Sequence, residues 1–199
     1  MKRMIYVSAS LVIVFILSQL IMSYSLNKIE NPSYVVLKDF GDFEVRLYDS
    51  MIMANTPLSN NTYEQNANEG FRRVASYIFG QNEREEKIAM TSPVFMEMGN
   101  SPSMSFVMPK QYNRQDLPDP TVRDVELVTV KPMRLAVISF SGYANDEKIA
   151  AYRKKLMGLM IKNGINPGNQ YYFLGYNAPW QVIGRKNEVA IEIKEETNN

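Results

Sequence analysis

The sequence predicts one α+β domain, with a curved antiparallel sheet or barrel flanked by two helices and preceded by a hydrophobic N-terminal helix. Three observations predict it. After residue 30 the apolar residues alternate with period two in short segments, which is typical of strands. Two longer segments have apolar residues on one helical face. The order strand, strand, helix, strand, strand occurs twice, so two similar units can bury their apolar faces against each other.

The N-terminal segment is the first element. Lys2 and Arg3 precede an apolar stretch over residues 5–22, which as a helix spans roughly 27 Å. Two interpretations are favoured: an uncleaved membrane anchor with the domain exported, or a signal peptide cleaved near residues 23–25, leaving a secreted or periplasmic domain. A buried helix of the main domain is a third. We therefore divide the chain into an anchor or signal segment, residues 1–30, and a folded domain, residues 31–196.

The first half of the domain begins with a hairpin. Alternating residues on either side of Gly41 predict two strands within residues 34–48. Thr62 followed by Gln65 is a capping-box pattern, and it predicts a helix over residues 62–78 that ends at Gly80. Two further strands are expected over residues 87–98 and 103–108.

The second half repeats this order after a Pro-containing linker at residues 109–121. Strands are expected over residues 125–130 and 135–140. Asn145 can cap a helix that ends at Gly164. The last strands are expected over residues 171–176 and 188–193. Aligning the halves pairs the strand of Tyr34 with that of Glu126.

The composition excludes several classes of function. The chain has 199 residues and a net charge of +1, so it lacks the basic character of a nucleic-acid-binding domain. It contains no Cys and no His. Disulfides, thiolate nucleophiles, Cys/His zinc sites and imidazole-based catalysis are therefore excluded. A haem bound here would have no His or Cys axial ligand.

Three segments carry a resemblance to a known family. They are residues 71–82 (FRRVASYIFGQN) leading into residues 87–94 (KIAMTSPV), the opening residues 34–48 with GDFEVR, and the closing residues 175–180 (GYNAPW) with residues 184–188 (GRKNE). Together they resemble the SOUL haem-binding protein family over about residues 31–194. The resemblance implies a distorted antiparallel β-barrel of duplicated β-α-β-β units with two flanking helices, a fold shared with bacterial effector-binding domains.

The resemblance also implies a non-catalytic protein that binds haem or another tetrapyrrole as a carrier or sensor. Its site would be a hydrophobic cleft between the outward face of the first helix and the loop before the last strand. Carried over by position, the ligand-binding residues are Asn68, Arg72, Ala75, Ser76, Phe79, Tyr176, Trp180 and Arg185. Aromatic rings would support a flat macrocycle and a guanidinium would pair with its propionates.

Other functions remain open. One is an effector-binding module of the same fold for another hydrophobic small molecule. Another is a hydrolase that uses a buried carboxylate, Glu44, Glu97 or Glu188, with a raised pKa. A third is a purely structural or partner-binding role. Alternate methionines on strands, such as Met96 and Met98, favour core packing over a copper or tetrapyrrole site. The sequence does not define the oligomeric state.

Overall fold

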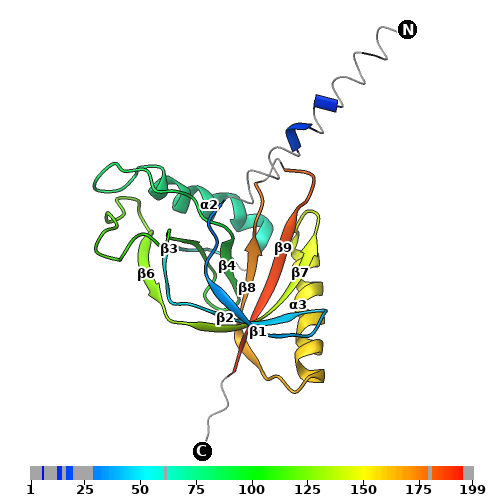
Figure 1. Ribbon diagram of the computed structural model, residues 1–199. Coiled ribbons are helices and arrows are strands. Elements are labelled where there is room, and N and C mark those ends of the chain that lie inside the picture. Colours follow the sequence, from blue (N-terminus) through cyan, green and yellow to red (C-terminus); the bar gives the residue numbers. More distant parts are fainter. Residues whose placement is uncertain are drawn as a thin grey trace, which may run out of the picture.

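The computed structural model describes residues 6, 13–14, 17–19, 29–60, 62–178 and 181–194. Within them, nine strands form one curled antiparallel sheet, an open half-barrel with two helices against it (Figure 1). The strands follow the order β1-β2-β7-β9-β8-β4-β5-β3-β6. In chain order the elements are β1 (Tyr34–Asp39), β2 (Glu44–Tyr48), β3 (Met51–Pro57), α2 (Tyr63–Ile78), β4 (Val94–Met98), β5 (Ser103–Val107), β6 (Glu126–Val130), β7 (Met133–Ser141), α3 (Asp146–Lys162), β8 (Pro167–Gly175) and β9 (Lys186–Ile193).

The two halves have the same order of elements and exchange one strand each. The first is β2-β3-α2-β4-β5 and the second is β6-β7-α3-β8-β9. They meet where β4 pairs with β8. β2 pairs with β7 of the second half, and β6 pairs with β3 of the first. This exchange joins the halves at three strand pairs, so neither half holds a complete sheet of its own.

Three details of the predicted strands differ from the structure. The sequence alignment paired the Tyr34 strand with the Glu126 strand, but β1 is an additional edge strand and β2 is the counterpart of β6. The prediction omitted β3, in which Met51, Met53 and Asn55 lie on one face and Ile52 and Ala54 lie on the other. The strand expected over residues 87–98 is regular only from Val94. The predicted hairpin of β1 and β2 is present, with Tyr34 opposite Tyr48.

The N-termini of the helices lie together. The side chain of Asn145 accepts a hydrogen bond from the Lys148 amide at 2.9 Å, as expected for the cap of α3. Thr62 is the N-cap residue of α2, but its side chain makes no capping bond. The Asp146 carboxylate accepts from the amides of Tyr63 and Glu64 at 2.6 and 3.2 Å instead. The start of α3 thus satisfies the first amides of α2 and places a negative charge at its positive end.

The two faces of the sheet bury different clusters. The larger cluster packs β-strand side chains such as Ala54 and Phe106 against both helices. The smaller cluster lies on the opposite, concave face and includes Tyr48, Phe95 and Leu174. Because side chains alternate along each strand, each strand supplies both faces.

Most of the predicted N-terminal hydrophobic helix, residues 5–22, lies outside the described residues. Within the part that the structure describes, none of the helices is long and apolar enough to cross a membrane. Gln19 is described and buried, and its side-chain oxygen accepts a hydrogen bond from the Val182 amide at 2.9 Å.

Candidate functional site

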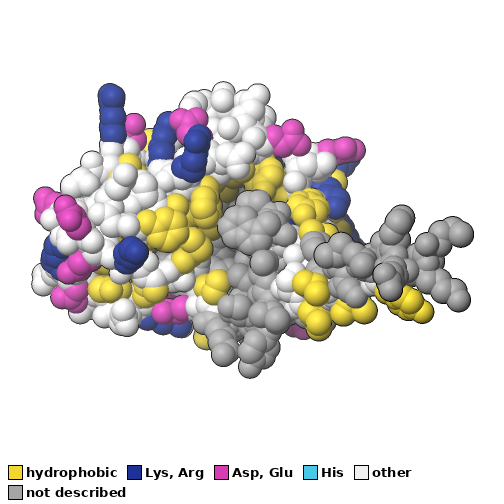
Figure 2. All heavy atoms as spheres, turned by 90° about the horizontal axis from the view of Figure 1, so that it is seen from above, with side chains coloured by type: hydrophobic (Ala, Val, Ile, Leu, Met, Phe, Trp, Pro, Cys, Tyr) yellow, Lys and Arg dark blue, Asp and Glu magenta, His cyan; other side chains and the backbone are white. Residues whose placement is uncertain are grey.

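The exposed face of α2 carries part of the predicted site. Asn68 and Arg72 are exposed, and Phe79, the C-cap residue, is 59% exposed. Arg72 forms no ion pair with any described residue, unlike Arg73, which pairs with Glu69 one turn earlier. Seen from above, hydrophobic side chains gather across the middle of the molecule, and charged side chains lie mainly toward its edges (Figure 2). An unpaired guanidinium and an exposed ring on one helical face can bind a ligand with a flat apolar part and an anionic part.

Two other predicted ligand-binding residues of α2, Ala75 and Ser76, make contacts within the folded domain. Ala75 was expected on the outward face, but it is buried in the larger core cluster, and this expectation is wrong. Ala75 is buried like its neighbour Val74, so the rest of the domain covers more than one side of α2. Ser76 is half-buried, and its hydroxyl donates a hydrogen bond to the Arg73 carbonyl at 2.7 Å.

Arg185 stabilises the loop before β9 through hydrogen bonds within that loop. The buried guanidinium donates from Nη1 to the carbonyl oxygens of Ala178 and Gln181 at 2.9 and 2.6 Å. It also lies 4.2 Å from the centre of the Tyr143 ring. Burial raises the pKa of Tyr63, in the first turn of α2, and the charge of Arg185 opposes this rise. Trp180, a predicted ligand residue, lies outside the described residues.

Tyr176 points to the concave face of the sheet. Its phenol donates a hydrogen bond to Glu188 Oε2 at 2.6 Å, and its ring packs beside the smaller cluster. The helices lie against the other face. Among the described residues, therefore, the predicted site divides into the α2 face, the loop fastened by Arg185, and Tyr176 on the opposite side.

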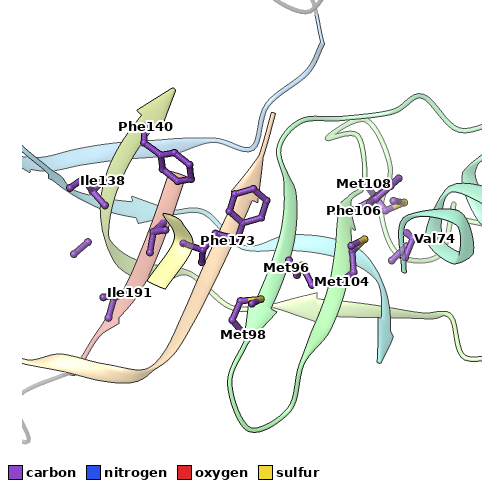
Figure 3. Packing of buried hydrophobic residues seen from close by; sticks show 14 of the residues in the cluster. Val74, Met96, Met98, Met104, Phe106, Met108, Ile138, Phe140, Phe173 and Ile191 are labelled. Atoms are coloured by element: carbon purple, nitrogen blue, oxygen red, sulfur yellow. The ribbon is translucent and has the colours of Figure 1, made fainter. Parts of the chain in front are cut away.

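The strand methionines fill the core, as the sequence favoured. Met96, Met98, Met104 and Met108 are buried in the larger cluster. Figure 3 shows Met104 and its neighbour Phe106 on β5 facing Val74 of α2, with Met96 and Met98 on the adjacent strand β4. Met90 is partly buried against the same cluster. Flexible thioethers are suited to filling the irregular space between a curled sheet and a helix.

An ion cluster lies on the concave face over β2, β7 and β9. Arg46 is 4% exposed and Glu188 is 0% exposed. Their side chains form two hydrogen bonds, Nη1 to Oε2 at 3.0 Å and Nη2 to Oε1 at 3.1 Å. Ser139 donates to Glu188 Oε1 at 3.0 Å, and Lys186 Nζ lies 3.0 Å from the same oxygen. Arg46 Nε also donates to Glu44 at 2.6 Å.

The pKa values in this cluster follow from burial and pairing. Burial alone would raise the pKa of Glu188, but the hydrogen bonds and charge of Arg46, with help from Tyr176 and Lys186, hold it below the ordinary value. Burial raises the pKa of Tyr176, and the neighbouring Glu188 raises it further. Burial also raises the pKa of Tyr48 to about 12, against the opposing effect of Arg46. The cluster is thus a charged, internally paired structure at neutral pH.

A cavity of about 590 Å³ occupies the other half of the concave face, over β3, β4, β5 and β6. Met53, Phe95 and Tyr172 contribute apolar surface to its lining, and Glu97 contributes a carboxylate. Gln170 Nε2 donates to Glu97 Oε1 at 3.2 Å. Burial raises the pKa of Glu97, and the charge of Glu192 adds to this rise, although Gln170 opposes it. None of the seven predicted site residues that the structure describes lines this cavity.

The three carboxylates considered for a hydrolase differ in environment. Glu44 and Glu188 are paired with Arg46, and the pKa of Glu188 is lowered rather than raised. The pKa of Glu97 is raised by burial, but its carboxylate is half-buried rather than enclosed. Among the described residues no group of three His, Cys, Asp or Glu side chains is placed to hold a metal ion.

The sequence analysis did not identify the concave face of the sheet as a candidate site. One signal was available, because Arg46 lies between the apolar residues Val45 and Leu47 in a predicted strand, where an unpaired charge is costly. Which residues would meet across the exchanged strands could not be deduced from local periodicity.

Comparison with known proteins agrees with this architecture, an α+β domain built on one curled antiparallel sheet. The model of the SOUL heme-binding protein family matches residues 29–192, and the chain belongs to this family. It is 29% identical to human heme-binding protein 2 over 181 residues, covering 84% of this chain and 88% of that protein. It is 28% identical to Xenopus laevis heme-binding protein 1 over 160 residues, covering 76% and 84%. The crystal structure of the EcmrR C-terminal domain has the same fold, with a TM-score of 0.58, 9% identity, and coverage of 77% and 99%.

Proposed function

We propose that this protein binds haem or a related tetrapyrrole without catalysing a reaction on it. Membership of the SOUL family is the observation that carries the proposal. The ligand would lie against the exposed face of α2, with its ring over Phe79 and its propionates near Arg72. The loop fastened by Arg185 would form the other side. A carrier or sensor of an amphipathic planar molecule needs this combination of apolar contact and anion recognition.

The residues present fit the ring and its propionates better than they fit the iron. The sequence contains no His and no Cys, so neither an imidazole nor a thiolate can coordinate haem iron. Phe79 offers an exposed aromatic surface, and Arg72 has no competing carboxylate among the described residues. We therefore infer that recognition depends on the macrocycle and its charge, with the metal contributing little.

Paired titrations test this proposal. Haem binding is followed by its Soret absorbance, and binding of iron-free protoporphyrin IX is followed by its fluorescence. We expect both ligands to saturate the full chain at micromolar concentrations, with dissociation constants within about 10-fold of each other, a difference of about 1.4 kcal/mol. Failure of both ligands to saturate would overturn the proposed function. A strong preference for haem would overturn the metal-independent part.

We also propose that the apolar N-terminal segment tethers the domain to a membrane. The proposal rests on the apolar stretch over residues 5–22 behind Lys2 and Arg3. Gln19 contacts the loop before β9, so the tether would leave the domain beside that loop. Membrane fractionation of the native host with a carbonate wash tests it: the intact chain should stay with the membranes, whereas recovery of a shortened, freely extracted chain would support cleavage instead.

A further inference from the structure

A second cavity, of about 620 Å³, lies at the end of α3 on the face of the sheet that carries the helices. The hairpin of β1 and β2, the turn after α3, the start of β7 and the end of β9 surround it. Its volume is within the range of roughly 300–1,000 Å³ that is usual for small-molecule pockets. The start of α3 lies against the start of α2, and α3 has 17 residues, so its far end is roughly 25 Å away from that junction. The cavity therefore shares no residue with the proposed tetrapyrrole surface.

The floor of this cavity is apolar. Val45 belongs to the larger core cluster, and Phe40, Ile165 and Ile193 are partly buried against the same cluster. Phe40 is held in place by Phe43, with ring centres 4.5 Å apart and planes at 3°. An alkyl chain can therefore displace water from a preformed apolar surface at the edge of the core.

The charged side chains among the described residues that line the cavity are all cations, and they are Lys38, Arg134 and Lys194. None of the three forms an ion pair within the part of the chain that the structure describes. Lys38 lies opposite Val45 in the sheet, so it shares the face that carries the helices. One strand separates β1 from β7, which places the backbones of Lys38 and Arg134 roughly 12 Å apart. Long basic side chains can meet around one oxyanion across this span.

The acidic groups near the cavity are engaged elsewhere. The Asp39 carboxylate accepts a hydrogen bond from the Gly41 amide at 2.7 Å. The turn of the hairpin reaches α3 (Figure 1), where Asp42 lies 3.4 Å from Lys155 Nζ. Glu192 on β9 acts on the concave face, where its charge raises the pKa of Glu97. The described residues thus leave the cavity with an uncompensated positive charge.

The charge distribution along the chain and the end of α3 are compatible with an anion. Residues 126–194, which include β7, α3 and β9, have 10 Lys and Arg against 5 Asp and Glu, whereas residues 29–125 have 9 against 14. The summed field of these charges attracts anions to the second half of the domain. The last carbonyls of α3 accept from the amides of Asn163, Gly164 and Ile165, so the negative end of the helix is capped beside the cavity.

We propose that this cavity binds a single-chain amphiphile whose headgroup is a carboxylate or a phosphate. The alkyl chain lies over Phe40 and Ile193, and the headgroup lies between Lys38 and Arg134. The cations favour an anionic headgroup over a cationic one, because no carboxylate among the described residues lines the cavity. The apolar floor favours an amphiphile over a bare inorganic anion.

Three probes test the two parts of this proposal. Decyl phosphate, decyltrimethylammonium and inorganic phosphate are titrated separately into the full chain by calorimetry, below the concentrations at which the decyl compounds form micelles. We expect one saturable site for decyl phosphate and at least about 10-fold weaker binding of the other two. Equal affinity for the decyl cation would overturn the role of the charges. Equal affinity for inorganic phosphate would overturn the role of the apolar floor.

Two matched double variants locate the site. Lys38→Gln/Arg134→Gln removes two exposed cations from the cavity and should weaken decyl phosphate binding by at least about 10-fold. Arg123→Gln/Lys131→Gln removes the same charge from exposed positions outside the cavity and should change the affinity by less than about 2-fold. Thermal unfolding of both variants near the Tm of wild type would show that they fold. Equal decyl phosphate affinities for the two variants would overturn the assignment of the site.

A third variant tests the acidic residues that follow the cavity in the sequence. Glu195 and Glu196 come directly after Lys194 and lie outside the described residues. Glu195→Gln/Glu196→Gln removes two negative charges from the sequence beside Lys194, so this variant should bind decyl phosphate at least as tightly as wild type. Weaker binding by this variant would contradict a site that is selected by positive charge.

Two further measurements separate this site from a membrane surface and from the haem proposal. Vesicles containing phosphatidylglycerol should bind wild type and Lys38→Gln/Arg134→Gln equally. Vesicle binding that depends on these two residues, without binding of dissolved decyl phosphate, would assign the cations to a membrane surface and overturn the proposal. Saturating haem should leave decyl phosphate affinity unchanged, and displacement by haem would overturn a separate site. Failure of haem to bind would overturn only the proposed function.

Discussion

Arg46 and Glu188 lie 142 positions apart in the chain and form a bidentate ion pair on the concave face of the sheet. Arg46 is on β2 and Glu188 is on β9, and both strands pair with β7, which lies between them. The pair therefore connects the strand that the first half exchanges to the last strand of the second half. Both side chains are almost completely buried, so the surrounding hydrogen bonds must compensate for lost hydration.

The first prediction concerns the stability of this pair. Arg46→Met leaves the buried carboxylate of Glu188 with weaker compensation, and we expect it to lower the free energy of unfolding by about 3–5 kcal/mol. Adding Glu188→Leu should recover most of that loss, because no isolated charge then remains. Arg73→Met is the matched control: it breaks an exposed pair with Glu69 and should cost less than about 1 kcal/mol. Denaturant unfolding of the four proteins measures these values. Similar losses of unfolding free energy for Arg46→Met and Arg73→Met would show that the buried Arg46–Glu188 pair contributes no more to stability than an exposed pair.

The second prediction is a loss of stability in acid. The pKa of Glu188 is lowered from the ordinary value of 4.5, so the folded protein binds this proton less readily than the unfolded chain. The stabilisation is then fully present above pH 4.5 and is lost as the pH falls through the folded-state pKa. Thermal unfolding between pH 7 and pH 3 should show a steeper decline in Tm for wild type than for the Arg46→Met/Glu188→Leu variant. Equal declines in Tm would show that carboxylates other than Glu188 cause the loss of stability in acid.

Local patterns in the sequence predicted most elements of the fold. Asn145 capped α3 as expected, and the alternation of Phe43 and Val45 identified β2. Gly80 has a φ of +114° just after α2, which is the conformation expected where a helix ends. These features depend on neighbouring residues, so one sequence was sufficient to predict them.

Features that depend on distant partners were not predicted. Asp146, rather than Thr62, satisfies the first amides of α2, because the two helix starts meet only in the folded domain. Ala75 is buried because the folded chain covers more of α2 than its helical periodicity alone indicates. Whether Arg185 reaches a ligand or the carbonyls of its own loop depends on the loop's conformation, which its sequence does not specify. The residues of the candidate tetrapyrrole site therefore remain predictions.

The third prediction concerns Glu97. Its pKa is raised from 4.5 by burial and by Glu192, while Gln170 opposes this and Tyr172 and Ser103 face it from neighbouring strands. The folded protein therefore binds the proton more readily than the unfolded chain, and the ionised carboxylate destabilises the fold above the folded-state pKa. Glu97→Gln should raise Tm at pH 7, and this advantage should diminish as the pH falls from the folded-state pKa towards 4.5 and be lost below it. A pH-independent difference, or a lower Tm at pH 7, would contradict the burial argument.

The fourth prediction separates ligand binding from folding at α2. Phe79 is 59% exposed, so Phe79→Ala should change the free energy of unfolding by no more than about 0.5 kcal/mol. If the ring supports a tetrapyrrole, the same variant should weaken haem binding by about 10-fold or more, since one buried aromatic contact contributes about 1–2 kcal/mol. Ile161→Ala removes a comparably exposed apolar side chain near the end of α3 and should leave haem affinity unchanged. Soret titrations and denaturant unfolding of both variants measure the two effects. Equal haem affinities for the two variants would place the tetrapyrrole away from Phe79, because the variants differ mainly in which helix loses its exposed apolar surface.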